Sequence, residues 1–253
     1  MGRNLWTREE EIIVFNLYCK IPFQKSSKFH PEVIRIAKLI GRSPSAVNMK
    51  IGNFGRMDPA LKEKKITGLT NGSKLDADIW NEFHNNWDEL AYQSECLISQ
   101  LSNSDSVQNQ YQSNGILEGG EKIVTVKARI NQNFFRKAIL SSYGCCCVTG
   151  IATEQLLIAS HIKPWKDCNA NEKTDPRNGL CLNALHDKAY DRGLITVTPD
   201  FKIHISKRIK DIYQGQVIKE YFDCYDGKKI IIPEKFLPNK SFLEYHNDMI
   251  YDQ

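Results

Sequence analysis

A polar stretch near the middle of the chain places the strongest constraint on how it can fold. Residues 102–120 are rich in Ser, Asn, Gln and Gly and contain almost no apolar clusters. This composition is typical of a flexible connection between folded parts. At 253 residues the chain also exceeds the size of one typical domain. We therefore expect a helical domain over residues 1–100, a linker over residues 101–121 and a second domain over residues 122–253.

The first part of the chain carries signals for three short helices. Thr7 and Glu10 have the spacing of a capping box, and apolar residues at helical intervals follow them. A second helix is predicted over residues 31–40, with a glycine just past its end. Ser43 and Pro44 then have the residue types that open a third helix. The pattern predicts a trihelical, helix-turn-helix-like domain.

The basic residues are concentrated in this first part. Residues 1–66 contain 13 Lys and Arg against 6 Asp and Glu, although the net charge of the whole chain is only +4. Such a segment suits phosphate contacts, and the alternative is an ordinary solvated surface. The segments 6–10 and 41–43 resemble those of Myb-like trihelical domains. The resemblance implies that the third helix enters the major groove of DNA, with contacts from Arg42, Asn48, Lys50, Asn53 and Arg56. A helical interaction or dimerisation module is the alternative.

The rest of the chain alternates helices and strands. Residues 76–94 have the spacing of one long amphipathic helix, whose aromatic side chains are expected in the core. After the linker, the patterns predict helices over residues 123–143 and 184–191, a strand over residues 156–159, and a hairpin that turns at Pro199 and Asp200. A closing strand and a short helix end the chain. The second domain is therefore expected to be α+β.

One constellation in this second domain carries chemistry. A strand ends in His161, a loop carries Asn178, and a helix carries His186, Asp187 and Asp191. Such a ββα arrangement can converge on one divalent ion. Phosphodiester hydrolysis needs a base to activate water and a cation to stabilise negative charge. Asp187 and Asp191 are four residues apart, so they can offer two ionised oxygens on one helix face to a hard cation.

The same segments closely resemble the HNH nuclease family, in particular a branch of bacterial restriction enzymes. The resemblance extends from about residue 129 to residue 192 and rests on three blocks, residues 147–150, 160–165 and 178–182. It implies a ββα-metal fold in which His161 is the general base. Asn178 would hold the imidazole or touch the metal. The last position stays open between His186 and Asp187.

One departure from the family concerns the metal ligands. Many members carry Asp just before the first His as a metal ligand, and this chain has Ser160 there. The exact ligand set is therefore open among Asn178, His186, Asp187 and Asp191. Basic residues flank the site and are candidates to clamp phosphates, or else plain surface charges: Arg136, Lys163, Arg177, Lys188 and Arg192. The histidines outside the pattern, His30, His84, His204 and His246, are expected to have no catalytic role.

Together these features predict a DNA endonuclease that uses Mg²⁺ or Mn²⁺. The resemblance suggests restriction or another defence against foreign DNA, and cutting both strands would favour a homodimer. Two alternatives are a DNA-binding or regulatory protein without cleavage, and an HNH effector whose first domain senses a partner or ligand. The eight cysteines lack metal-site spacing, and residues 145–147 are expected to be small buried side chains. With no apolar run long enough for a membrane, we expect a cytoplasmic protein.

Overall fold

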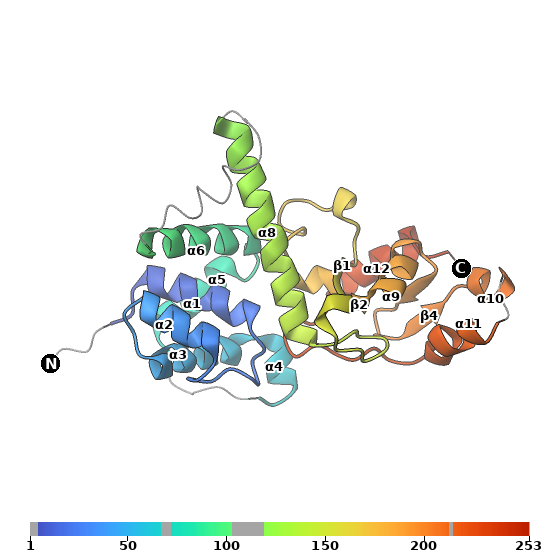
Figure 1. Ribbon diagram of the computed structural model, residues 1–253, viewed down its shortest axis with the longest axis horizontal. Helices are drawn as coiled ribbons and strands as arrows, with labels where there is room; N and C mark the ends of the chain where they lie inside the picture. Colours follow the sequence, from blue (N-terminus) through green and yellow to red (C-terminus); the bar gives the residue numbers. More distant parts are fainter. Residues whose placement is uncertain (1–4, 67–71, 103–118, 213–214, 253) are drawn as a thin grey trace. The chain divides into compact units, whose positions relative to one another are not determined.

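The structure is a computed structural model that describes residues 5–66, 72–102, 119–212 and 215–252 (Figure 1). It contains two compact units, Met1–Ser141 and Ser142–Gln253. Most of the predicted linker lies outside the described residues. Helix α8 (Gly119–Tyr143) belongs to the first unit up to Ser141, whereas the sequence assigned residues from 122 onward to the second domain. No helix in the described ranges is long and apolar enough to cross a membrane.

The three predicted N-terminal helices form where the sequence places them. Thr7 caps α1 (Arg8–Lys20) with the expected reciprocal capping box to Glu10. α2 (Pro31–Leu39) is followed by Gly41 at φ +67°, a left-handed conformation that glycine adopts without strain. The Ser43 side chain accepts a hydrogen bond from the Ala46 N–H at the start of α3 (Pro44–Met57). Local capping chemistry is therefore enough to place these helix ends.

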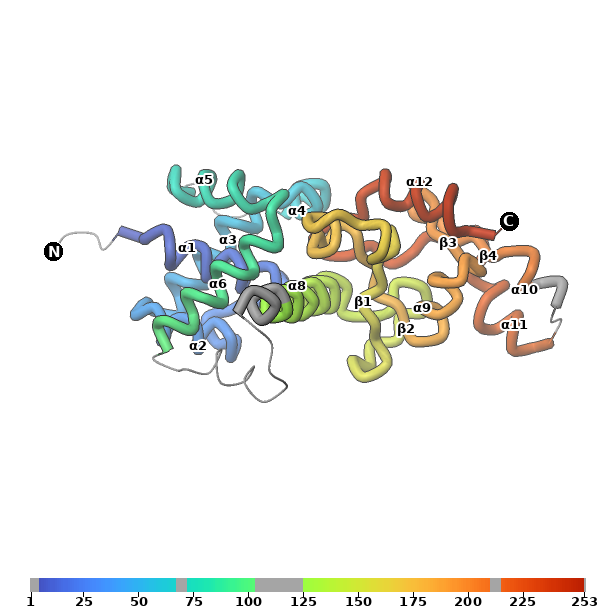
Figure 2. The backbone as a smooth tube through the Cα atoms, turned by 90° about the horizontal axis from the view of Figure 1, so that it is seen from above, coloured from blue at the N-terminus to red at the C-terminus, as the bar shows by residue number. Residues whose placement is uncertain are grey.

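These helices do not form a separate trihelical domain. The short helix α4 (Pro59–Glu63) follows α3, and α1 packs against α5 (Lys74–Phe83) and α6 (Trp87–Leu101) as well as against α2 and α3 (Figures 1 and 2). Three aromatic side chains of α5 and α6 lie in this core, as predicted, namely Trp80, Phe83 and Trp87, whereas Tyr92 on α6 is only half-buried. The single long helix expected over residues 76–94 is wrong, because Asn86 adopts φ −138° and ψ 56° and interrupts the helical backbone.

The second unit is built around two short antiparallel strand pairs. β1 (Leu157–His161) pairs with β2 (Gly179–Asn183), and β3 (Ile195–Val197) pairs with β4 (Ile203–Ile205), the predicted hairpin. The predicted helix over residues 184–191 is confirmed as α9 (Ala184–Asp191). Of the predicted closing strand, the structure shows only a bridge between Lys202 and Lys229. The mixture of helices and small sheets fits the expected α+β class.

Short elements complete the second unit. The 3-10 turns are η1 (Glu154–Leu156), η2 (Trp165–Asp167), η3 (Pro176–Asn178) and η4 (Asp223–Tyr225). The remaining helices are α10 (Lys207–Ile212), α11 (Gln216–Tyr221) and α12 (Lys240–Met249), which is the predicted C-terminal helix.

The direction of α9 is fixed by β2 and by its cap. Every residue of β2 is buried. At its end, the Asn183 side chain accepts hydrogen bonds from the N–H groups of Leu185 and His186. This cap satisfies two of the donors that a helix N-terminus otherwise leaves unpaired. Strand, cap and helix follow one another without a loop, so α9 lies directly beside β1 and β2.

Candidate active site

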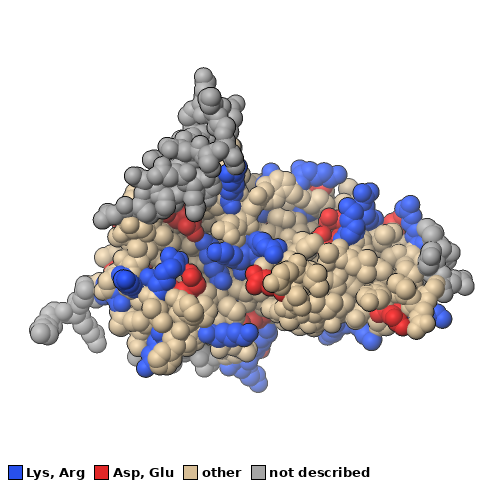
Figure 3. Space-filling model, viewed as in Figure 1, with Lys and Arg blue, Asp and Glu red and all other residues tan. Residues whose placement is uncertain are grey.

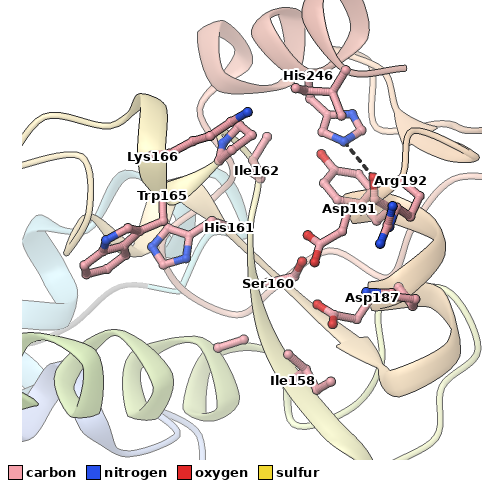
Figure 4. Close-up of a pocket in the computed structure, with 15 residues that line it drawn as sticks. Ile158, Ser160, His161, Ile162, Trp165, Lys166, Asp187, Asp191, Arg192 and His246 are labelled. Atoms are coloured by element: carbon pink, nitrogen blue, oxygen red, sulfur yellow. Dashed lines mark hydrogen bonds between the residues drawn. The ribbon is translucent and has the colours of Figure 1, made fainter. Parts of the chain in front are cut away.

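A pocket of about 670 Å³ lies in the second unit (Figure 4). Its walls come from β1, the turn that includes Trp165, helix α9 and the C-terminal helix α12. Successive side chains of a strand point to opposite faces. In Figure 4, His161 therefore lies on one side of β1, and Ser160 lies on the other side with Asp187 and Asp191. All four residues line the pocket.

His161 is held as a neutral imidazole. Its Nε2 atom lies 3.0 Å from the Lys173 carbonyl oxygen. Because a carbonyl can only accept, Nε2 carries the proton and Nδ1 carries the lone pair. Burial lowers the pKa of His161, and the hydrogen bond to Lys173 opposes that shift in part. The Trp165 ring packs edge-on against the imidazole, with the ring centroids 5.4 Å apart. The side chain is therefore oriented and unprotonated near neutral pH, as a general base requires.

Asp187 and Asp191 form a pair of carboxylates on the adjacent face of α9. Burial raises the pKa of both, and the charge of Asp191 raises the pKa of Asp187 further. The Ser160 hydroxyl faces Asp187 closely enough to lower its pKa, although the two fall short of a full hydrogen bond. In the part of the chain that the structure describes, neither carboxylate forms an ion pair. The charges of Lys188 and Arg192 lower the pKa of Asp191 in part, but neither carboxylate is in an ion pair, so both can take a positive ion.

The donor set fits a hard cation better than zinc. Among the described residues, no cluster of three or more His, Cys, Asp or Glu side chains is placed to hold a metal. Structural zinc sites need four such ligands, and catalytic zinc sites need three. Mg²⁺ instead binds through one or two carboxylates and keeps waters and substrate phosphates as its other ligands. Asp187 and Asp191 supply the two carboxylates that such a Mg²⁺ site needs.

Asn178 has a different place from the expected one. Its side chain is buried, and its Oδ1 atom accepts the Lys163 N–H at 2.9 Å. Its amide nitrogen donates to the Glu172 carbonyl at 3.1 Å and to the Cys168 sulfur at 3.2 Å. Both polar atoms therefore clamp the loop that presents the Lys173 carbonyl to His161. The geometry gives Asn178 a loop-fixing role and not the predicted contact with imidazole or metal.

His186 does not fit the predicted catalytic and metal-binding roles either. The ring is fully buried and is not part of the pocket wall. Its Nδ1 atom lies 3.1 Å from Asn183 Oδ1, and its Nε2 atom lies 2.8 Å from the Tyr221 carbonyl oxygen. Because the neutral ring has a single N–H, Nε2–H donates to the closer Tyr221 carbonyl and ties α9 to α11. Of the two candidates for the last position, only Asp187 lines the pocket, and the buried His186 does not.

The basic residues near the site divide into paired and unpaired groups. Lys163 forms an ion pair with Glu172 at 2.8 Å, and Arg177 is held by Asp175 at 2.6 Å. These two predicted phosphate contacts are therefore already engaged. The exposed cations of the pocket wall form no ion pair with any described residue: Lys166, Lys188 and Arg192. Lys188 and Arg192 are among the predicted phosphate contacts and stay predictions, and Lys166 was not predicted. Arg136 lies on α8, in the first unit.

The predicted DNA contacts of the first unit are mostly engaged in internal bonds. Lys50 is only 4% exposed and forms ion pairs with the buried carboxylates of Glu11, at 2.7 Å, and Asp76. Asn53 donates to Asp76 at 2.9 Å. Lys50 therefore cannot reach bases or phosphates in this structure, which corrects the prediction for that residue. The cause is its position on the face of α3 that packs against α1 and α5.

The other three predicted contacts show a similar pattern. Arg42 donates to both carboxylate oxygens of Glu10, at 2.9 and 2.7 Å, and its guanidinium lies over the Trp6 ring. Asn48 accepts a hydrogen bond from the Ser26 hydroxyl at 2.6 Å. The half-buried Arg56 lies against Gly72. On the face shown in Figure 3, Lys and Arg are spread among Asp and Glu and do not form one basic patch. The Myb-like arrangement of DNA contacts gains no support from these positions.

Comparison with known families concerns the second unit. Residues 146–198 match a family model described as HNH endonuclease. The matched segment includes β1, β2, α9 and β3, and with them His161, Asp187 and Asp191. No match to this chain was found among curated proteins. The match supports an HNH nuclease domain in this part of the chain.

Proposed function

We propose that the second unit is a metal-dependent endonuclease that hydrolyses phosphodiester bonds in DNA. The observation that carries the proposal is that one pocket contains both a candidate general base and candidate metal ligands. His161 lines it as a neutral imidazole, and Asp187 and Asp191 line it as carboxylates without an ion pair. The match of residues 146–198 to the HNH endonuclease model supports the same reaction class.

His161 is the proposed general base. Its Nδ1 atom takes a proton from water as the water oxygen attacks the phosphorus atom, the P–O bond to the leaving oxygen breaks, and that oxygen takes a proton from solvent. The Lys173 carbonyl holds Nε2–H, so the ring keeps the orientation and tautomer needed for this transfer. Asn178 fixes the loop that supplies this carbonyl. Burial keeps the pKa of the ring below its ordinary value, so the base is unprotonated at neutral pH.

Asp187 and Asp191 are the residues that would hold a divalent ion such as Mg²⁺ or Mn²⁺. When bound, such an ion stabilises the negative charge that develops on the phosphate oxygens. The exposed cations Lys166, Lys188 and Arg192 would bind flanking phosphates of the same strand. Their position in the pocket wall favours a polyanionic substrate, and DNA is the substrate class that we propose.

The test is cleavage of a supercoiled plasmid with Mg²⁺ or Mn²⁺. We expect the natural chain to nick the plasmid, and His161→Ala and Asp187→Asn to lose that activity. His204→Ala is the matched control, because His204 is exposed on β4 and does not line the pocket. Full activity of His161→Ala with added metal would refute the proposal. Tight DNA binding without cleavage under any metal would favour a regulatory protein instead.

A single site cuts one strand in each event. Double-strand cleavage would therefore favour two copies of the chain acting on opposite strands, as in a homodimer. A role in restriction or defence against foreign DNA would need such cleavage. Linear product that increases more steeply than nicked product with protein concentration would support the dimer. Linear product that appears only after all the plasmid is nicked would contradict it.

For the first unit, we propose sensing of a partner or ligand as a second candidate function, since its predicted DNA contacts are already engaged. The side chains expected to read DNA are bonded within the unit, and Lys50 is buried. Exchange of the exposed Lys25 and Lys28 for Glu should then leave the DNA affinity of the chain and its salt dependence unchanged. A DNA-reading module would instead lose affinity and part of its salt dependence.

A further inference from the structure

We propose that His246 is a positioning residue that holds α9 so that its two carboxylates face the pocket. The inference rests on the proposed function, because that function gives those carboxylates their role as metal ligands. His246 lies on α12, after the end of the segment that matches the HNH endonuclease model. It is only 1% exposed, yet it belongs to the pocket wall (Figure 4).

The His246 ring contacts α9 in two ways at one residue. Its Nε2–H donates to the Tyr190 carbonyl oxygen at 3.1 Å. Its face also stacks on the Tyr190 ring, with the centroids 3.7 Å apart and the planes 14° apart. Tyr190 directly precedes Asp191 and lies three residues after Asp187. A movement of Tyr190 would therefore move both carboxylates.

The Tyr190 carbonyl lies at the end of α9, where helix carbonyls lack partners within the helix. It accepts from the Gly193 N–H at 2.9 Å as well as from His246. A helix of eight residues has little stability of its own and depends on tertiary contacts. Asn183 fixes its first turn, and His246 fixes its last turn. Together with the His186 contact to α11, these two anchors define the direction in which Asp187 and Asp191 point.

A third element sets the tautomer of His246. The Thr196 hydroxyl, on β3, lies 2.8 Å from His246 Nδ1. Because Nε2–H donates to a carbonyl, Nδ1 of the neutral ring accepts the Thr196 hydrogen. The ring thus joins α12, α9 and β3 with all its hydrogen-bonding capacity in use. It has no remaining nitrogen for a proton transfer or a metal, so its role is to position α9.

Variants at His246 can separate these contacts. His246→Phe keeps a ring that can stack on Tyr190 and removes both hydrogen bonds. His246→Gln can keep a donor to the Tyr190 carbonyl and loses the stack. Thr196→Val removes the hydroxyl and leaves His246 in place. Ile203→Val, in the buried hairpin, is the control for general loss of stability.

Two measurements on the full-length chain test the inference. Hydrogen exchange of α9 amides shows whether the helix is anchored, and Mn²⁺ titration by calorimetry shows whether the carboxylates are placed. We expect His246→Phe to increase exchange in α9 and to weaken Mn²⁺ binding about tenfold. Thr196→Val should act in the same direction with a smaller effect. His246→Gln should recover part of the affinity, and Ile203→Val should leave it unchanged.

The outcomes distinguish this inference from the proposed function. If His246→Phe and Thr196→Val leave both α9 exchange and Mn²⁺ affinity unchanged, the positioning role is refuted. Should His246→Phe fail to fold, Thr196→Val decides the same question, because it leaves the ring in place. Normal exchange protection in a natural chain that binds no Mn²⁺ would refute the metal site and not the anchoring of α9.

Discussion

Replacement of His246 by Phe should remove a large part of the pH dependence of stability. Burial lowers the pKa of His246 to about 4, whereas an unfolded chain has a histidine pKa of about 6.5. Between these two values the unfolded state binds more protons than the folded state. Stability is therefore lost as the pH falls below 6.5, and this loss levels off below pH 4. The shift corresponds to a loss of about 2 kcal/mol between pH 7 and pH 5.

The assay is urea unfolding of the natural chain and of His246→Phe at pH 7 and at pH 5. Burial also lowers the pKa of His161 and His186, so some acid destabilisation remains in the variant. The difference between the two proteins isolates His246. The variant is expected to be less stable at pH 7, because it loses two hydrogen bonds, and to lose less stability on acidification. An equal loss of stability in both proteins between the two pH values would refute the argument.

Further predictions concern the charged residues. Lys50→Met should destabilise the first unit by about 3–5 kcal/mol, since it leaves two buried carboxylates without a cation. Urea unfolding measures this, and a loss of DNA affinity at unchanged stability would support the Myb-like contact instead. The lowered pKa of His161 predicts that the acid limb of the cleavage rate has its midpoint below pH 6.5, and a midpoint above that value would contradict the assignment. Lys166→Ala should weaken DNA binding and reduce its salt slope by about one, whereas Lys163→Ala should not, and equal effects in binding assays would contradict the distinction.

Local signals in the sequence predicted much of the fold. The capping box at Thr7, the Ser43 cap and the hairpin depend on residues close together in the chain, and each appears in the structure. The split of the expected long helix also has a local cause, but it depends on the backbone conformation of Asn86, which periodicity does not report. Helix positions were therefore more predictable than the packing between helices.

The error at Lys50 was avoidable. The buried positions of α3 include Val47, Lys50, Ile51 and Phe54, which have the spacing of one helix face. Lys50 lies on that apolar stripe, so its burial could have been expected from periodicity. Its carboxylate partners could not be predicted from the sequence, because Asp76 lies on α5 and contacts Lys50 only in the folded unit.

The choice between His186 and Asp187, in contrast, could not be made from the sequence. The sequence places both on α9, and one step along a helix turns a side chain to a different face. Which face meets the pocket depends on how α9 packs against β1 and on the buried contacts of His186 with α11. His246 was missed for a similar reason, because it reaches α9 from a distant part of the chain. No local pattern carries that information.

Pairing of charges then separates structural residues from proposed functional ones in the second unit. Lys163 and Arg177 have carboxylate partners, so their charges stabilise the loop in which they lie. Asp187, Asp191 and Lys166 line the pocket without an ion pair among the described residues. Such unpaired charges do not stabilise the fold. A bound cation would complement the two carboxylates, and a phosphate would complement Lys166. Lys163 and Lys166 are only three positions apart in the sequence, so variants of these two lysines compare a paired charge with an unpaired one most directly.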